Sequence, residues 1–139
     1  MTAVPGCVFC AIAAGDVPAS MILRDDDVAA FLDARPVFKG HVLVVLRDHF
    51  PTLSDVPAPA LGTLFAAVQR VARAVEAGLD ADGTFVAMNN KVSQSVPHLH
   101  VHVVPRKRKD GLRGFFSPRV PYADDAEREA FAEKIRAAL

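Results

Sequence analysis

Three of the five histidines in this 139-residue chain lie at alternating positions, His98, His100 and His102. Successive side chains of a β-strand point to opposite faces, so a strand through this segment would place all three imidazoles on one face. Near neutral pH, imidazoles transfer protons, attack electrophiles and bind metals. Neither chance nor an ordinary solvated sheet face explains this spacing well, and we therefore interpret the segment as a site of histidine chemistry.

A metal ion shared by all three histidines is one interpretation of this spacing. Because a strand rises about 3.3 Å per residue, the Cα atoms of His98 and His102 would lie about 13 Å apart. Zinc–nitrogen bonds are only about 2.1 Å long, so three ligands from one strand fit a single ion poorly. A neighbouring pair fits better, as does one outer histidine joined by ligands from elsewhere in the chain.

The two cysteines, Cys7 and Cys10, form a C-x-x-C pair near the N-terminus. Structural disulfides are rare in cytosolic proteins, so metal binding and redox chemistry are the main interpretations of such a pair. A redox pair usually follows a strand of a parallel sheet, which this sequence does not predict, and metal binding is therefore favoured. A further interpretation treats both cysteines as small apolar residues of a helix.

The hydrophobic pattern predicts the elements that must position these residues. We expect strands over residues 21–23, 28–32, 41–46, 84–88 and 98–104, with short helices over residues 7–14 and 124–139. Apolar residues recur at helical spacing over residues 60–79, which predicts one long helix. Strands in series, interrupted by one long helix, predict an α+β fold with an antiparallel sheet of about five strands and helices on one face.

Composition and charge limit the class of protein. Hydrophobic residues make up 51% of the chain, and 16 Lys and Arg balance 16 Asp and Glu. This balance is typical of a soluble globular domain and not of a bulk nucleic-acid binder. The length predicts a single domain over residues 1–139. With no secretory signal and no apolar run near the roughly 20 residues of a membrane span, we expect a cytoplasmic protein that contacts neither membranes nor nucleic acid.

The segment His98-Leu99-His100-Val101-His102-Val103-Val104 matches the His-φ-His-φ-His-φ-φ signature of the histidine-triad (HIT) family, where φ is apolar. Residues 7–12, 30–33, 40–44, 94–96 and 105–106 also resemble family segments. The resemblance implies the HIT-like fold and a homodimer that acts on nucleotides. It further implies that His100 attacks the α-phosphorus of a nucleoside phosphoramidate or dinucleoside polyphosphate. The product would be a covalent nucleotidyl-histidine that water then hydrolyses.

The resemblance also implies roles for the residues around His100. His102 would hydrogen-bond the phosphoryl oxygens or the leaving group, and His41 would support the triad through hydrogen bonds. Asp33 would bind the ribose hydroxyls by accepting their hydrogen bonds. Other nucleotide contacts would come from Phe9, Phe31 and Leu32 at the nucleoside, and from Asn89, Gln94 and Ser95 at the phosphates and leaving group. For the apolar residues a plain core role is an equal alternative.

A structural zinc site is the second implication of the resemblance. Cys7, Cys10, His49 and His98 supply two thiolates and two imidazoles, which are the ligand types of a closed tetrahedral zinc site. The zinc-containing branch of the family binds metal at the corresponding positions. Such a zinc would tie the N-terminal helix to the histidine strand, and His98 would then position His100 through the backbone.

Two segments beside the histidine strand differ from the family pattern or have an open role. The loop over residues 89–94 is about two residues shorter than the usual family loop and lacks its glycines. The basic run over residues 106–109 could contact substrate phosphates or a partner subunit, or form an ordinary solvated turn.

The chain could also be a nucleotide-binding or scaffold protein without catalysis, against which the intact triad argues. A zinc hydrolase that uses metal-bound water is the other alternative.

Overall fold

The structure of the chain is a computed structural model that describes residues 3–113 and 120–139. The chain divides into two compact units, Met1–Arg108 and Lys109–Leu139. Every predicted site residue belongs to the first unit. The prediction of a single domain over residues 1–139 stays a prediction.

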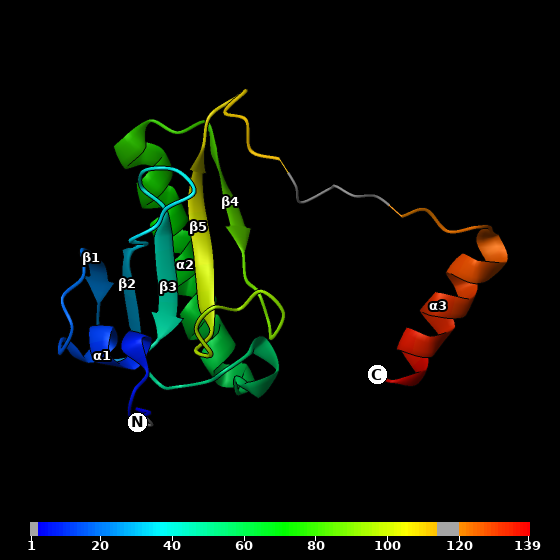
Figure 1. Ribbon diagram of the computed structural model, residues 1–139, viewed down its shortest axis with the longest axis horizontal. Coiled ribbons are helices and arrows are strands. Elements are labelled where there is room, and N and C mark those ends of the chain that lie inside the picture. The colour runs from blue at the N-terminus through cyan, green and yellow to red at the C-terminus, as the bar shows by residue number, and fades with distance from the viewer. Residues whose placement is uncertain (1–2, 114–119) are drawn as a thin grey trace. The chain divides into compact units, whose positions relative to one another are not determined.

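The first unit is built on a five-stranded antiparallel sheet with the strand order β1-β2-β3-β5-β4 (Figure 1). This sheet confirms the predicted α+β fold. The strand β3 is central and its valine-rich sequence is buried throughout, as its composition predicts. The strands are β1 (Met21–Arg24), β2 (Val28–Leu32), β3 (Val42–Leu46), β4 (Gly83–Ala87) and β5 (His100–Arg106).

Helices cover both faces of the sheet, which corrects the expectation that they lie on one face. The long helix α2 (Ala58–Leu79) buries one apolar stripe against the first face, where it packs on β2, β3 and β5 (Figure 1). The seven-residue helix α1 (Val8–Ala14) packs on the opposite face instead. Since α2 already fills the first face, the apolar side chains of α1 can be buried only on the second one. The α1 side chains that do so are Phe9, Ile12 and Ala13.

Alternation along β3 and β5 separates the core beneath α2 from the face that carries the histidines. Val44 and Val101 point toward α2 and are fully buried there. Their neighbours point the other way, and the register pairs Val45 with His100 and Leu43 with His102. Residues directly opposite each other on antiparallel strands share a face, so both histidines lie on the α1 side of the sheet.

The strand β5 begins at His100, two residues later than predicted. The backbone N–H of His98 donates to Val96 O at 2.8 Å, and that of Leu99 donates to Phe50 O at 2.8 Å. These bonds tie residues 98–99 to nearby loops and not to the strand ladder. His98 therefore occupies the entrance to β5 and is not one of three equivalent strand positions.

The described residues of the second unit include the helix α3 (Asp125–Ala137), where a helix over residues 124–139 is predicted. Asp124 caps its first turn by accepting a hydrogen bond from the Glu127 N–H at 2.8 Å. Among the residues that the structure describes, no helix combines the length and the apolar composition of a bilayer span.

Gly40 precedes His41 and has φ +97°, a backbone conformation that residues other than glycine rarely adopt. A Cβ there would also overlap Leu79 Cδ1 at the end of α2. Because Leu79 is half exposed and can turn away, the backbone strain dominates. We expect Gly40→Ala to lower the free energy of unfolding by about 1–2 kcal/mol, measured by urea denaturation.

Gly62 offers a matched control for this substitution. It lies within α2, and a Cβ there would meet no heavy atom within 4 Å. Gly62→Ala should raise the free energy of unfolding by about 0.5–1 kcal/mol. A Gly40→Ala variant as stable as the wild type would show that this loop needs no left-handed residue.

Candidate active site

The ring of His98 is buried and carries its proton on Nε2. Its exposed fraction is only 1%, and Nε2 lies 2.8 Å from the carbonyl oxygen of Leu46. Because a carbonyl can only accept, the ring donates from Nε2 and its Nδ1 carries the lone pair. Burial lowers the pKa of His98 to about 4, so the ring is neutral at pH 7.

The ring of His100 has the opposite tautomer. Its Nδ1 lies 2.8 Å from the carbonyl oxygen of His98, so Nδ1 must donate. In the neutral ring, Nε2 is then left with an unprotonated lone pair. The side chain is 4% exposed and packs edge-on against the Phe9 ring, with the two centroids 5.0 Å apart. The backbone of His98 thus determines which nitrogen of His100 keeps its lone pair.

A hydrogen-bonded chain through His41 sets the third tautomer. The backbone N–H of Val37 donates to His41 Nδ1 at 3.0 Å, so the His41 proton lies on Nε2. His41 Nε2 lies 2.9 Å from His102 Nδ1, which must therefore accept. His102 consequently carries its proton on Nε2. Burial is the main cause that lowers the pKa of His102 to about 4, and the positive charges that His100 and His41 carry when protonated contribute to this shift.

Asp33 begins the loop between β2 and β3 that ends at His41. Its backbone N–H donates to the His41 carbonyl at 2.9 Å, which closes residues 33–41 into a loop between β2 and β3. Its Oδ2 lies 3.7 Å from His41 Nδ1, and its Oδ1 accepts the Arg35 N–H at 2.9 Å. Burial lowers the pKa of His41, and the negative charge of Asp33 partly opposes this shift. The carboxylate therefore faces the histidine chain from its outer end.

A cavity of about 630 Å³ lies beside these residues and has the size of a small-molecule site. Phe9 packs edge-on against Phe31, with ring centroids 5.4 Å apart, and the same Phe9 ring contacts His100. The cavity therefore adjoins the triad through one aromatic side chain. The predicted nucleoside contacts Phe9, Phe31, Leu32 and Asp33 all line it, together with Ile12, Ser20, Arg35 and Leu43.

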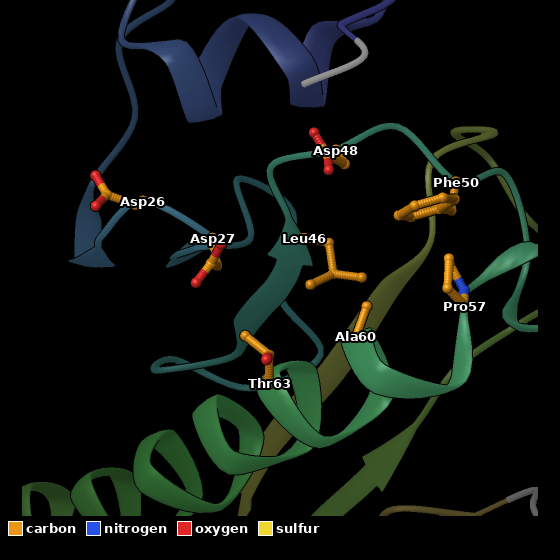
Figure 2. A pocket seen from close by; sticks show the side chains of 8 residues that line it. All are labelled: Asp26, Asp27, Leu46, Asp48, Phe50, Pro57, Ala60 and Thr63. Carbon is orange, nitrogen blue, oxygen red and sulfur yellow. The ribbon is translucent and has the colours of Figure 1, made fainter.

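A smaller cavity of about 380 Å³ lies on the α2 side of the sheet. Figure 2 shows the carboxylates of Asp26 and Asp27 on one side of Leu46 and that of Asp48 above it, with Phe50 on the other side. Three carboxylates at one rim repel an anionic ligand such as a phosphate. The cavity beside His100 is therefore the better candidate for a nucleotide.

The predicted phosphate contacts lie in the loop before β5, where each is placed differently. The Gln94 amide binds the loop itself, since Oε1 accepts from the Lys91 N–H at 2.8 Å and Nε2 donates to Pro51 O at 2.6 Å. The exposed Asn89 donates from Nδ2 to Ser93 O at 3.2 Å. Ser95 is exposed and lines a separate cavity of about 460 Å³. Their contacts with a nucleotide stay predictions.

Positive φ angles show how this loop turns without the glycines of the family. Lys91 and Ser93 have φ 69° and 60°, in the left-handed region that glycine usually occupies. Asn90 Oδ1 accepts from the Leu53 N–H at 2.7 Å and attaches the loop to η1 (Leu53–Asp55). Hydrogen bonds from neighbouring side chains thus hold a strained backbone in place.

The four predicted metal ligands come together in one cluster. Cys7, Cys10, His49 and His98 each offer a ligand atom, and these atoms all lie within 4.8 Å of one another. Cys10 Sγ lies 3.4 Å from both His49 Nδ1 and His98 Nδ1, and Cys7 Sγ lies 3.5 Å from His98 Nδ1. Bond lengths of about 2.3 Å and 2.1 Å at tetrahedral angles would separate sulfur and nitrogen by about 3.6 Å. The donor types and their spacing therefore fit a zinc ion.

Sequence reasoning missed several residues of this region. The backbone N–H of Val37 sets the His41 tautomer, and neither its position nor its role has a signal in the sequence. Ser20 and Arg35 line the large cavity because loops bring them there. Leu43 could have been found, since it lies two residues after His41 and alternation places it on the histidine face.

Comparison with known proteins identifies the family. The sequence matches the HIT domain over residues 14–109. The chain belongs to the HIT family. An uncharacterized HIT-like protein of Mycobacterium tuberculosis is 41% identical over 138 residues, covering 96% of this chain and 92% of that protein. The fold agrees as well: a Streptococcus mutans crystal structure superposes with a TM-score of 0.88 at 36% identity, covering 98% of this chain and 87% of that one.

Other HIT relatives are named for activities on nucleotides or contain zinc. The adenylylsulfatase of Arabidopsis thaliana is 32% identical, covering 76% of this chain and 55% of that protein. The adenosine 5′-monophosphoramidase of Schizosaccharomyces pombe is 28% identical, covering 93% and 95% of the two chains. A zinc-bound histidine-triad protein of Mycobacterium smegmatis has a TM-score of 0.74 at 38% identity, with coverage of 96% and 98%.

The depressed pKa of His102 predicts how stability depends on pH. Histidine has a pKa of 6.5 before burial and His102 has about 4 in the folded chain, so between these values the unfolded chain binds more protons. The free energy of unfolding must therefore fall as the pH decreases from about 6.5 toward 4, with a contribution from His102 of at most about 1.4 kcal/mol per pH unit. Urea denaturation across this range measures the slope.

The variant His102→Asn tests this contribution. The pKa values of His98 and His41 are lowered in the wild type as well, so the difference between the two slopes reports His102 together with its effect on the hydrogen-bonded His41. The variant should lose less stability on acidification than the wild type. Equal slopes would show that His102 titrates in the folded protein as it does in the unfolded chain.

Proposed function

We propose that this HIT protein is a nucleotide hydrolase or transferase that acts at the α-phosphorus, with His100 as the nucleophile. The observation that carries the proposal is the hydrogen bond from His100 Nδ1 to the His98 carbonyl at 2.8 Å. In the neutral ring, this bond leaves the Nε2 lone pair free to attack. The named activities of the adenylylsulfatase and the phosphoramidase among its relatives support a nucleotide substrate.

In the first step, His100 Nε2 forms a bond to the α-phosphorus while the bond from phosphorus to the leaving group breaks. A sulfate or a second nucleotide leaves as an anion with the bonding electrons, and an amine leaves with the bonding electrons after taking up a proton from solvent. Neutral His102 donates its Nε2–H to a phosphoryl oxygen or to the leaving group. Charge that develops there is stabilised by a donor whose orientation His41 already sets.

In the second step, water attacks the phosphorus of the nucleotidyl-histidine and the phosphorus–nitrogen bond breaks. The attacking water releases one proton to solvent, the nucleoside monophosphate leaves, and His100 returns to its neutral form with the proton on Nδ1. A phosphoramidate on imidazole is labile, so two moderate barriers replace one high barrier. An acceptor other than water would make the same enzyme a transferase.

The cavity beside Phe9 is the proposed nucleoside site. Its volume of about 630 Å³ suits a nucleoside, and the apolar rings of Phe9 and Phe31 suit a base. Asp33 would accept hydrogen bonds from the ribose hydroxyls. Asn89 and Ser95 would contact phosphate or leaving group, and Gln94 would act by holding the loop. From the family resemblance we also infer a cytoplasmic homodimer.

We further propose that Cys7, Cys10, His49 and His98 hold a structural zinc ion. The tautomer of His98 supports this, because its Nε2–H bonds Leu46 and its Nδ1 lone pair faces the two sulfurs. Bound zinc would neutralise the thiolates and link α1 to the start of β5. His98 then contributes its ring to the metal and its carbonyl to His100.

Formation of a covalent intermediate tests the proposed nucleophile. After brief incubation with adenosine 5′-phosphoramidate or diadenosine tetraphosphate, intact-protein mass spectrometry should show an added adenylyl group on the wild type. His100→Ala should show no adduct and should release AMP at least about a thousandfold more slowly. Peptide mapping should place the acid-labile adduct on His100.

The two outcomes separate the competing functions. An adduct on the His100→Ala variant would place the nucleophile elsewhere. If neither substrate forms an adduct or releases AMP, and nucleotides bind wild type and variant equally well, the chain is a binding protein and not a hydrolase.

Removal of the metal ligands tests the zinc site. Metal analysis of the purified wild type should find about one zinc per chain, and Cys10→Ser should lose this zinc and unfold at a lower temperature. Chelation of the wild type should lower its unfolding temperature to that of the variant. Chelation that stops turnover at once without changing stability would instead identify a catalytic, water-activating zinc.

A further inference from the structure

Arg35 lines the proposed nucleoside cavity, whose walls are otherwise mainly apolar. Beside it, the cavity has hydrogen-bonding side chains at Ser20 and Asp33. If Asp33 binds the ribose, the base must meet its polar partners among the remaining groups. A long cationic side chain at that position offers the base directional hydrogen bonds.

The backbone around Arg35 is fixed although its side chain is exposed. Its N–H donates to Asp33 Oδ1 at 2.9 Å, which forms a tight turn over residues 33–35. Pro36 follows and restricts the Arg35 backbone to extended conformations. Within residues 3–113 and 120–139, no group forms a hydrogen bond or ion pair with the Arg35 guanidinium. A fixed backbone thus holds Arg35, whose guanidinium has no partner among the described residues, at the wall of the cavity.

We propose that Arg35 hydrogen-bonds to the base and makes guanine the preferred base of this site. The inference rests on the proposed function, because it assumes that the cavity binds the nucleoside. A guanidinium can only donate, and guanine presents two adjacent acceptors, O6 and N7, that match its fork. Adenine presents N7 beside an amino group, which is itself a donor, so the same fork finds one acceptor.

Arg35 could instead bind a phosphate group attached to the ribose. Asp33 argues against it, because its carboxylate lies two residues away in the same turn and would repel a second anion at the ribose. The aromatic rings of Phe9 and Phe31 place apolar surface suited to a base along the same cavity. The base is therefore the group that this combination favours.

Competing nucleotides test the inference. The wild type should hydrolyse guanosine 5′-phosphoramidate with a higher kcat/KM than adenosine 5′-phosphoramidate. Arg35→Ala should lower kcat/KM for the guanosine substrate about five- to tenfold, the lower end expected for a bidentate contact, and change the adenosine value less than twofold. The inosine substrate shares O6 and N7 with guanosine and should behave like it.

Two matched variants separate geometry from charge. Arg35→Lys keeps the charge but loses the fork, and it should resemble Arg35→Ala in its ratio of guanosine to adenosine kcat/KM. Arg70→Ala removes an exposed arginine of α2, a helix that packs on the sheet face opposite His100, and it should leave the ratio unchanged.

Binding of GMP and AMP, measured by calorimetry, keeps this test separate from catalysis. If neither phosphoramidate is hydrolysed but Arg35→Ala still removes a preference for GMP, the proposed hydrolase fails and base recognition stands. If both substrates are hydrolysed with a ratio that Arg35→Ala does not change, base recognition fails and the hydrolase stands. Tighter binding of adenosine 3′,5′-bisphosphate than of AMP, lost in Arg35→Ala, would overturn the inference in favour of a ribose phosphate.

Discussion

His98 is the residue on which the arrangement of the site depends, because its ring and its carbonyl group face different partners. The ring donates to Leu46 on β3 and turns its lone pair toward the two cysteines. The carbonyl accepts the Nδ1 proton of His100. The central strand, the cluster of candidate metal ligands and the proposed nucleophile are therefore linked through one residue. A displacement of β3 or of α1 would reach His100 through His98 as well as through the direct contacts of His100 with Val45 and Phe9.

Burial of the histidine rings changes their protonation as well as their packing. It holds His98 and His102 neutral at pH 7 by lowering both pKa values to about 4. Neutral imidazoles have one donor and one acceptor, so backbone groups of known polarity can determine each tautomer. The carbonyls of Leu46 and His98 and the N–H of Val37 do so here. The same histidines, if charged, could only donate and would repel one another.

The sequence predicted the sheet and the long helix because these follow from local periodicity, whereas the clustering of the four candidate metal ligands was predicted by the resemblance to the HIT family. Alternation correctly separates Val101 from His100, for example. It does not show that His98 precedes β5, because a hydrogen bond from Leu99 to the distant Phe50 ends the ladder there. The sequence pattern also did not predict that Arg35 lines the cavity or that the Gln94 amide donates a hydrogen bond to Pro51 O. Such contacts depend on how loops far apart in sequence meet in the folded chain.

The tautomers of the histidine rings are the most direct test of this account. Nitrogen-15 chemical shifts of the labelled protein at pH 7, with each ring assigned by comparison with single variants, distinguish a protonated Nδ1 from a protonated Nε2. The account predicts a proton on Nδ1 of His100 and on Nε2 of His98, His41 and His102. A proton on Nε2 of His100 would contradict it, because the proposed nucleophilic nitrogen would then have no lone pair.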